Sequence, residues 1–184
     1  MLKWTLFGVL ALSVLFSQAQ TNKTKIDAIV QMGHAQYITC SDLSDNGELA
    51  VTGSGDNSII LWDAINGKQI RTFNVHYKSI RSVNFNPNNS LIISTSKDNS
   101  VKVIDVKTGQ IKHAITFSKQ TIYNAYFSQD GSKFITLNDR DAYTVWSTEK
   151  GKDLGTFKKD FGGLKDELLI SPDGTKVLSK VNWA

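Results

Sequence analysis

Three polar residues near the start of the chain have the types that hydrolyse ester or peptide bonds. His34, Ser54 and Asp56 would supply a base, a nucleophile and a carboxylate to orient the base. Cys40, the only cysteine, could offer a thiol nucleophile instead, although a small buried thiol is the more common state. A catalytic centre needs only one such set, so a set that recurs along the chain would argue against catalysis.

The pattern recurs at an interval of 42 residues, and three copies align without a gap. A fourth copy begins near Gly162, needs one inserted residue and is incomplete. The aligned columns are His34 and His76, Asp56 and Asp98, Trp62 with Ile104 and Trp146, and Gly67 with Gly109 and Gly151. A catalytic triad is not built once per repeat, so we interpret these polar residues as structural.

Each repeat predicts four short strands separated by turn residues such as Asp45-Asn46-Gly47 and Asn66-Gly67. In the first strand of each repeat, apolar residues are spaced by three and then by two, as at Ile80, Val83 and Phe85. A period of two that slips to three indicates one extra residue. We therefore expect a β-bulge near Arg81-Ser82 and at the two equivalent places.

The motifs inside the repeat resemble those of the WD-repeat family of β-propellers. They are Gly33-His34, "GSGDNSIILWD" at 53–63, "DVKTGQ" at 105–110 and "SPDG" at 171–174. The resemblance runs from about Lys25 to the last residue. It implies an all-β fold, a β-propeller of four-stranded antiparallel blades. Three complete repeats would occupy 34–75, 76–117 and 118–160, and a truncated fourth 161–184.

The resemblance also implies a hydrogen-bonded polar set inside each blade, made of a His, a Ser or Thr, an Asp and a Trp. The matching residues are His34, Thr52 or Ser54, Asp56 and Trp62 in the first repeat, His76 and Asp98 in the second, and Trp146 in the third. The pattern is broken at Ile104, Ser118 and Arg140. We expect packing between blades to compensate there.

Propellers of this family usually bind proteins or peptides on one face, where the inner strands end. The matching columns are Tyr37, Ser79 and Thr121, then Thr39, Arg81 and Tyr123 at the bulges, then Gly55, Lys97 and Asp139. Tyr and Arg often anchor interfaces. Alternatively, Tyr37 and Tyr123 pack between blades and Arg81 is solvated. The expected function is a non-enzymatic interaction scaffold whose partner is a protein or peptide.

A second hypothesis is that the propeller is an accessory part of a secreted enzyme, such as a caspase-like peptidase, whose catalytic domain lies beyond residue 184. The sequence contains no HExxH, CxxC or GxSxG motif and no phosphate-binding glycine loop. A redox propeller of the pyrroloquinoline-quinone type is disfavoured because its regular tryptophan positions are missing. We therefore expect no catalytic residue, cofactor or metal within this chain.

Residues 1–19 have the order of a secretory signal. Lys3 precedes a mostly apolar run from Trp4 to Phe16, and Ser17-Gln18-Ala19 follows. The apolar run is shorter than the roughly 20 residues that span a bilayer, which disfavours a membrane anchor. We expect cleavage near Gln20, no stable membrane insertion of residues 20–184, and a secreted, periplasmic or cell-surface protein of a bacterium.

The charge pattern disfavours a nucleic-acid partner. The net charge of +4 comes from 21 basic and 17 acidic residues, and the basic residues are interspersed with acids. A single cysteine allows no internal disulfide, so the fold must be stabilised by a packed core.

Three repeats and part of a fourth fall short of a ring, because propellers have about four to eight blades. We expect the chain to be the N-terminal part of a longer protein, or an open array that oligomerisation completes. Further blades, in the same chain or from another, would close the ring. Lys25 to Gln31 would supply the outer strand of the last blade.

Overall fold

The computed structural model describes residues 33–139, 142–158, 168–171 and 176–179. The regular structure in these residues is entirely β-strand. The expected signal segment, the strand expected at 25–31 and Arg140 lie outside the described residues. Within the described part of the chain, no helix is long and apolar enough to cross a membrane.

Three four-stranded antiparallel sheets follow one another along the chain, and their strands neighbour each other in sequence order. The first sheet contains β1 (Ile38–Leu43), β2 (Leu49–Ser54), β3 (Ile59–Asp63) and β4 (Lys68–Phe73). The second contains β5 (Ile80–Phe85), β6 (Leu91–Ser96), β7 (Ser100–Asp105) and β8 (Ile111–Thr116). The third contains β9 (Ile122–Phe127), β10 (Lys133–Asn138), β11 (Ala142–Ser147) and β12 (Asp153–Lys158).

A short antiparallel pair, β13 (Leu168–Ile170) and β14 (Val177–Ser179), forms the fourth sheet. The prediction of all-β, four-stranded antiparallel blades is confirmed. The described sheets form part of a propeller and do not close a ring.

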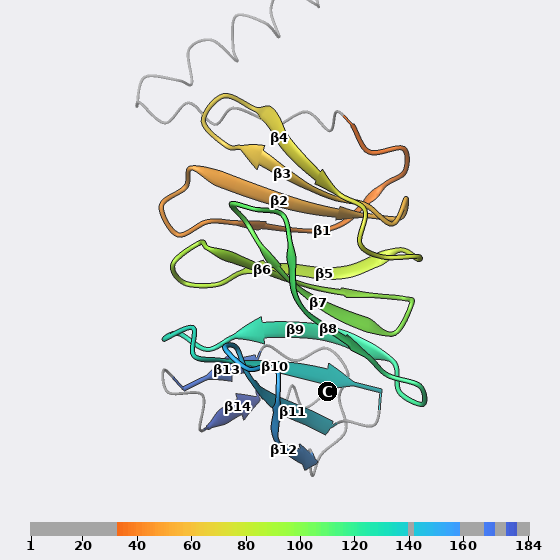
Figure 1. Cartoon of the computed structure of the whole chain (residues 1–184), viewed down its shortest axis with the longest axis vertical. Helices are drawn as coiled ribbons and strands as arrows, with labels where there is room; N and C mark the ends of the chain where they lie inside the picture. The colour runs from red at the N-terminus through yellow and green to blue at the C-terminus, as the bar shows by residue number, and fades with distance from the viewer. Residues whose placement is uncertain (1–32, 140–141, 159–167, 172–175, 180–184) are drawn as a thin grey trace, which may run out of the picture.

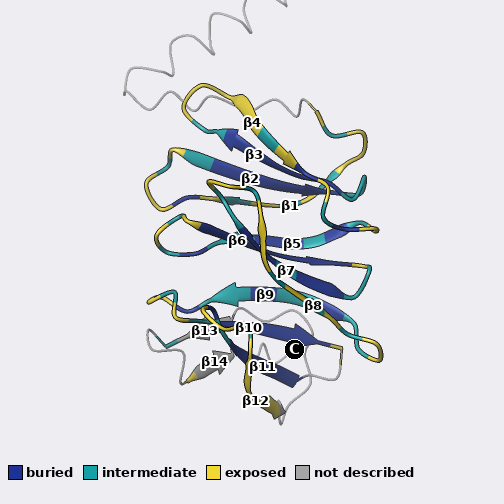
Figure 2. Ribbon diagram, in the orientation of Figure 1, coloured by how far each residue is buried: buried dark blue, intermediate teal, exposed yellow. Residues whose placement is uncertain are grey.

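The first strands of the sheets are the inner strands of this arrangement. β5 contacts both β1 and β9, and the three sheets follow one another along the long axis of the molecule (Figure 1). The second and third strands of each sheet are largely buried, whereas the outer strands β4 and β8 are largely exposed (Figure 2). The inner strands therefore bring residues about 42 positions apart into one region.

Two turns recur with the same backbone conformation because the same residue types recur. Gly67, Gly109 and Gly151 precede the outer strand of each sheet with φ values of 66°, 76° and 62°. Asn57 and Asn99 adopt φ values of 75° and 59° in the turn after β2 and β6. Glycine and asparagine tolerate this left-handed region better than other residues, which is why the turn sequences predicted the strand ends.

The predicted bulges are present in all three inner strands. The register of β5 against β6 shifts between Ile80 and Ser82, so Arg81 is the extra residue. Thr39 is the extra residue in β1, and Tyr123 in β9. A bulge re-aims the side chain of its extra residue, which gives each sheet one such side chain at the same position.

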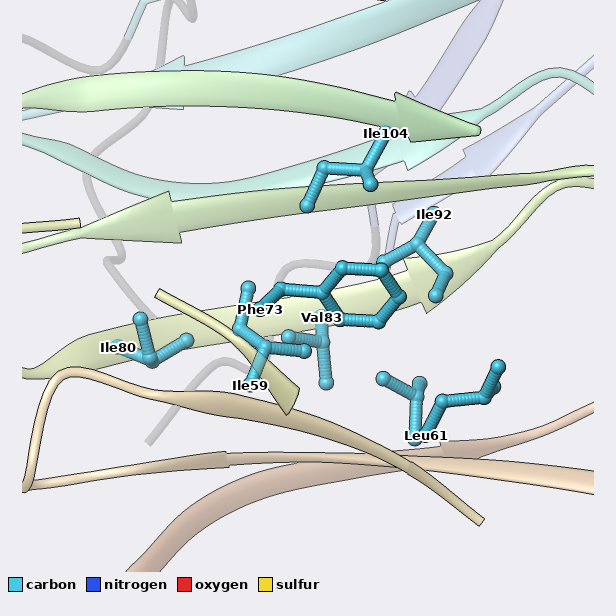
Figure 3. Packing of buried hydrophobic residues seen from close by; sticks show 8 residues of the cluster. Ile59, Leu61, Phe73, Ile80, Val83, Ile92 and Ile104 are labelled. Atoms are coloured by element: carbon cyan, nitrogen blue, oxygen red, sulfur yellow. The ribbon is translucent and has the colours of Figure 1, made fainter. Parts of the chain in front are cut away.

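Apolar side chains between neighbouring sheets hold the structure together. Between the first and second sheets, the buried cluster contains Val51, Ile59, Leu61, Phe73, Ile80, Val83, Ile92 and Ile104 (Figure 3). A second cluster lies between the second and third sheets and contains Phe134 stacked on Trp146, with ring centroids 6.1 Å apart. Ile104 takes the place of the tryptophan in the second repeat and is fully buried.

Candidate functional site

The polar set of the first sheet is hydrogen bonded from the segment before β1 to β2 and β3. Nδ1 of His34 lies 3.2 Å from Oδ2 of Asp56 and 2.9 Å from Oγ of Ser58. Nε2 of His34 lies 2.8 Å from Oγ1 of Thr52, which also accepts the indole N–H of Trp62 over 2.8 Å. A proton on Nδ1 would face the carboxylate, and Nε2 would then accept the Thr52 hydroxyl.

Thr52, and not Ser54, is the hydroxyl that joins the histidine to the tryptophan. Ser54 donates to the carbonyl of Gln36 over 3.2 Å, and its oxygen accepts the backbone N–H of Asp56 over 3.1 Å. Of the two alternatives, Thr52 and Ser54, Thr52 therefore joins the histidine to the tryptophan. Both residues point to the same side of β2, so sequence alternation could not choose between them.

The second sheet repeats the arrangement with smaller residues. Nδ1 of His76 lies 3.0 Å from Oδ2 of Asp98, and Nε2 lies 2.8 Å from Oγ of Ser94. Ser100 donates to Oδ1 of Asp98 over 2.6 Å. The side chain of Ile104 has no N–H group, so the Ser94 hydroxyl has no indole partner here. In the third sheet, Trp146 donates to Oγ1 of Thr136 over 3.0 Å, which keeps the tryptophan half of the set.

The protonation states in the set suit a structural role. Burial opposes ionisation of Asp98, but hydrogen bonds from Ser100 and from the N–H of Tyr77 outweigh it and lower the pKa of the carboxyl. Burial lowers the pKa of His76, despite the attraction of Asp98. The side chains of His34 and His76 are fully buried, so neither ring can reach a substrate in solution.

The free thiol is not activated. Cys40 is half-buried beside the first apolar cluster, and burial raises its pKa. A thiol with a raised pKa stays protonated at neutral pH and is a poor nucleophile. Among the described residues, no group of three or more His, Cys, Asp or Glu side chains is placed to hold a metal ion.

Six of the nine residues in the three columns expected to bind a partner surround one groove of about 530 Å³, which we call the rim groove. Its lining is Tyr37, Thr39, Ser79, Ile80, Arg81, Lys97, Tyr123 and Asn124. Residues from all three sheets contribute to it. Ile80 and Asn124 were not among the expected binding residues. Asn124 directly follows the bulged Tyr123, and this position is the signal that could have identified it.

The turns beside the rim groove have one backbone hydrogen bond in common. The N–H of Gly55 donates to the carbonyl of Tyr37 over 3.0 Å. In the same way, the backbone N–H of Lys97 donates to the carbonyl of Ser79 over 2.9 Å. The backbone N–H of Asp139 donates to the carbonyl of Thr121 over 2.9 Å. Thr121 and Asp139 therefore occupy the equivalent turn of the third sheet, but they do not line the rim groove.

Two aromatic side chains flank the rim groove in different ways. The guanidinium carbon of Arg81 lies 5.1 Å from the centre of the Tyr123 ring, close enough for a cation–π interaction. Tyr37 is 64% exposed, so it does not pack between blades. Its ring lies against Gly55, where an added Cβ would be 3.2 Å from two ring atoms. Arg81 is half-buried, and its Nε is buried without a hydrogen-bond partner.

Comparison with known proteins relates these repeats to one family. Residues 28–63 and 67–105 match the family model described as "WD domain, G-beta repeat". The chain is 31% identical over 147 residues to "Protein tipD" of Dictyostelium discoideum, which covers 80% of this chain and 24% of that protein.

Two further relatives have other functions in their names. "Transcription factor unc-37" of Caenorhabditis elegans is 26% identical over 161 residues, covering 84% of this chain and 26% of that protein. "Eukaryotic translation initiation factor 3 subunit I" of Meyerozyma guilliermondii is 27% identical over 155 residues, covering 83% and 44%. The chain thus spans about a quarter to less than half of these relatives. All three are eukaryotic, so they do not support the prediction of a bacterial source.

Proposed function

We propose that this chain, in which residues 28–63 and 67–105 match the WD-repeat family model, is a non-enzymatic interaction scaffold that binds a protein or peptide in the rim groove. Proteins with these repeats generally act as scaffolds for other proteins, and one relative is named as a subunit of an initiation factor. The observation that carries the proposal is that Thr39, Arg81 and Tyr123, from three different sheets, line the same groove.

The residue types that line the rim groove, and the backbone structure that holds them, suit a docking site. Tyr and Arg anchor protein interfaces because they bury a large area and also form hydrogen bonds. The bulges hold Arg81 and Tyr123 in position, and backbone hydrogen bonds hold the adjacent turns. A partner would therefore meet a surface that needs little ordering on binding, which lowers the entropic cost of association.

The test compares groove variants with variants on the outer strands and their turns. Arg81→Ala or Tyr123→Ala should each weaken capture of a partner from native extract by roughly 1–3 kcal/mol. Lys112→Ala, in β8, and Lys152→Ala, beside β12, are matched controls that should change binding little. Circular dichroism would verify the fold of each variant. Loss of binding in the controls but not in the groove variants would show that the partner uses another surface.

The alternative of an accessory propeller beside a caspase-like peptidase gains no supporting observation from the described residues. Export is a separate part of the proposal and is supported by the order of residues 1–19 alone. The mature protein should begin at or near Gln20. N-terminal sequencing of protein from its native source checks this, and an intact Met1 on the cytosolic protein would contradict it.

Ring closure is the last part of the proposal. The sheets that the structure describes leave the ring open, so further blades from the same polypeptide or from another chain would complete it. Light scattering on the purified chain of 184 residues separates the two sources. A mass above that of a monomer supports blades from a second chain, and a monomer supports blades in the same polypeptide.

A further inference from the structure

We infer that the rim groove binds an acidic side chain, Glu or Asp, of its protein partner between Arg81 and Lys97. This inference rests on the proposed function, because it names the chemistry of the partner that docks there. Three observations support the inference: the charges that line the groove, the missing hydrogen-bond acceptor of Arg81, and the apolar side chains of the groove walls.

The charges that line the groove have one sign. Among the residues that the structure describes, Arg81 and Lys97 are the two ionic residues of the lining at neutral pH, and no carboxylate lines it. Neither cation forms an ion pair with a residue that the structure describes. The positive potential is therefore not neutralised from within the described part of the chain, and an anion would be attracted to it.

Arg81 is a cation that lacks an acceptor. Its Nε is buried and has no hydrogen-bond partner, although its side chain is only half-buried. Partly buried charges in proteins are usually paired, because desolvation without a partner is unfavourable. The cation–π contact with Tyr123 orients the guanidinium but accepts none of its N–H groups in a conventional hydrogen bond. A carboxylate could accept hydrogen bonds from the part of the guanidinium that remains accessible in the groove.

Lys97 is placed to complete the contact. It is exposed in the turn between β6 and β7, and its N–H bond to the carbonyl of Ser79 holds its backbone at the rim. An ammonium on a flexible stem can adjust to an anion that the planar guanidinium has positioned. The equivalent column of the third sheet holds Asp139, which does not line the groove.

The walls favour a carboxylate on an apolar stem. Tyr37, Ile80 and Tyr123 present rings and a branched aliphatic side chain beside the two cations. Glu and Asp carry their charge on methylene groups, which can contact these walls while the carboxylate reaches the cations. The mixture of apolar walls and two charges therefore fits an acidic peptide segment.

The test selects peptides from a random seven-residue library with the full chain of 184 residues. The expected result is enrichment of Glu or Asp at one position. Changing that residue to Gln in a synthetic, fluorescently labelled peptide should weaken binding about 10-fold or more, measured by anisotropy. Arg81→Gln should weaken the acidic peptide similarly and remove its preference over the Gln peptide. Lys112→Gln is the matched control and should leave binding unchanged.

A second variant and a second peptide keep the inference falsifiable. Arg81→Lys retains the charge, so it should keep part of the preference even if Arg81→Gln folds poorly. If Tyr123→Ala abolishes binding but Arg81→Gln and Lys97→Gln do not, the groove is a docking site and the inference is overturned. A phosphoserine peptide that binds far more tightly than the Glu peptide would overturn it as well. If no peptide is selected, or none is sensitive to groove variants, the proposed docking site fails with it.

Discussion

The indole N–H of Trp62 donates to the hydroxyl of Thr52 over 2.8 Å, and Trp146 and Thr136 repeat this relationship over 3.0 Å. The bond joins two neighbouring strands within one sheet and places a large ring at the same depth each time. In the second sheet Ser94 keeps the hydroxyl, but Ile104 removes the donor. The hydrogen-bonded set therefore tolerates loss of one member when an apolar side chain fills the space.

Replacing Thr52 with Val should destabilise the protein. The change keeps the volume but leaves the Trp62 N–H and one ring nitrogen of His34 without their partner, so the free energy of unfolding should fall by about 1–3 kcal/mol. Urea unfolding checks this. Thr72→Val is the matched control, because Thr72 is exposed and, among the described residues, its hydroxyl accepts a bond only from Gln69. Its cost should stay within about 0.5 kcal/mol, and equal costs at both sites would contradict the prediction.

Stability should decrease in two steps as the pH falls. The folded pKa of His76 is below its ordinary value of 6.5, so the unfolded chain binds more protons below that pH and unfolding becomes easier. The pKa of Asp98 is lowered from 3.8, so a further decrease should begin near that pH. Denaturant midpoints between pH 7.5 and 3 measure both steps. His76→Gln should remove the first step, and an unchanged profile in this variant would contradict the assignment.

Introducing a side chain at Gly53 should disturb the contact between the first two sheets. An added Cβ would lie 2.5 Å from Cγ2 of Ile80 and 2.7 Å from Sγ of Cys40, closer than such atoms approach. Gly53→Ala should therefore lower the free energy of unfolding by about 1–3 kcal/mol. Cys40→Ala, combined with it, should recover part of this loss. A fully stable single variant would show that the sheets separate more easily than the packing indicates.

The aromatic cluster between the second and third sheets should contribute strongly to stability. Phe134 is fully buried, stacks on Trp146 and meets Phe127 edge-to-face with centroids 6.1 Å apart. Phe134→Ala should cost about 3–5 kcal/mol. Leu154→Ala removes a side chain that is 52% exposed and should cost far less. Thermal or denaturant unfolding of both variants checks the difference, and similar midpoints would contradict it.

Much of the fold could be predicted from the sequence because its causes are local and repeat. The three-then-two spacing of apolar residues predicted an extra residue near Arg81, and β5 has it there. The glycines before each outer strand predicted turns, because only a residue without a side chain enters the left-handed region freely. The order of strands within each sheet followed from short turns between antiparallel neighbours.

The choice between Thr52 and Ser54, and the shape of the rim groove, came only from the tertiary structure. Two residues apart on one strand share a face, so alternation could not show which hydroxyl meets His34. The sequence placed Arg81 and Tyr123 in equivalent columns, but their contact depends on how neighbouring sheets pack. Asp139 belonged to the same expected set but does not line the groove, because the three sheets contribute different positions to the lining. Side chains 42 residues apart meet only where the apolar clusters between sheets set the distance and angle.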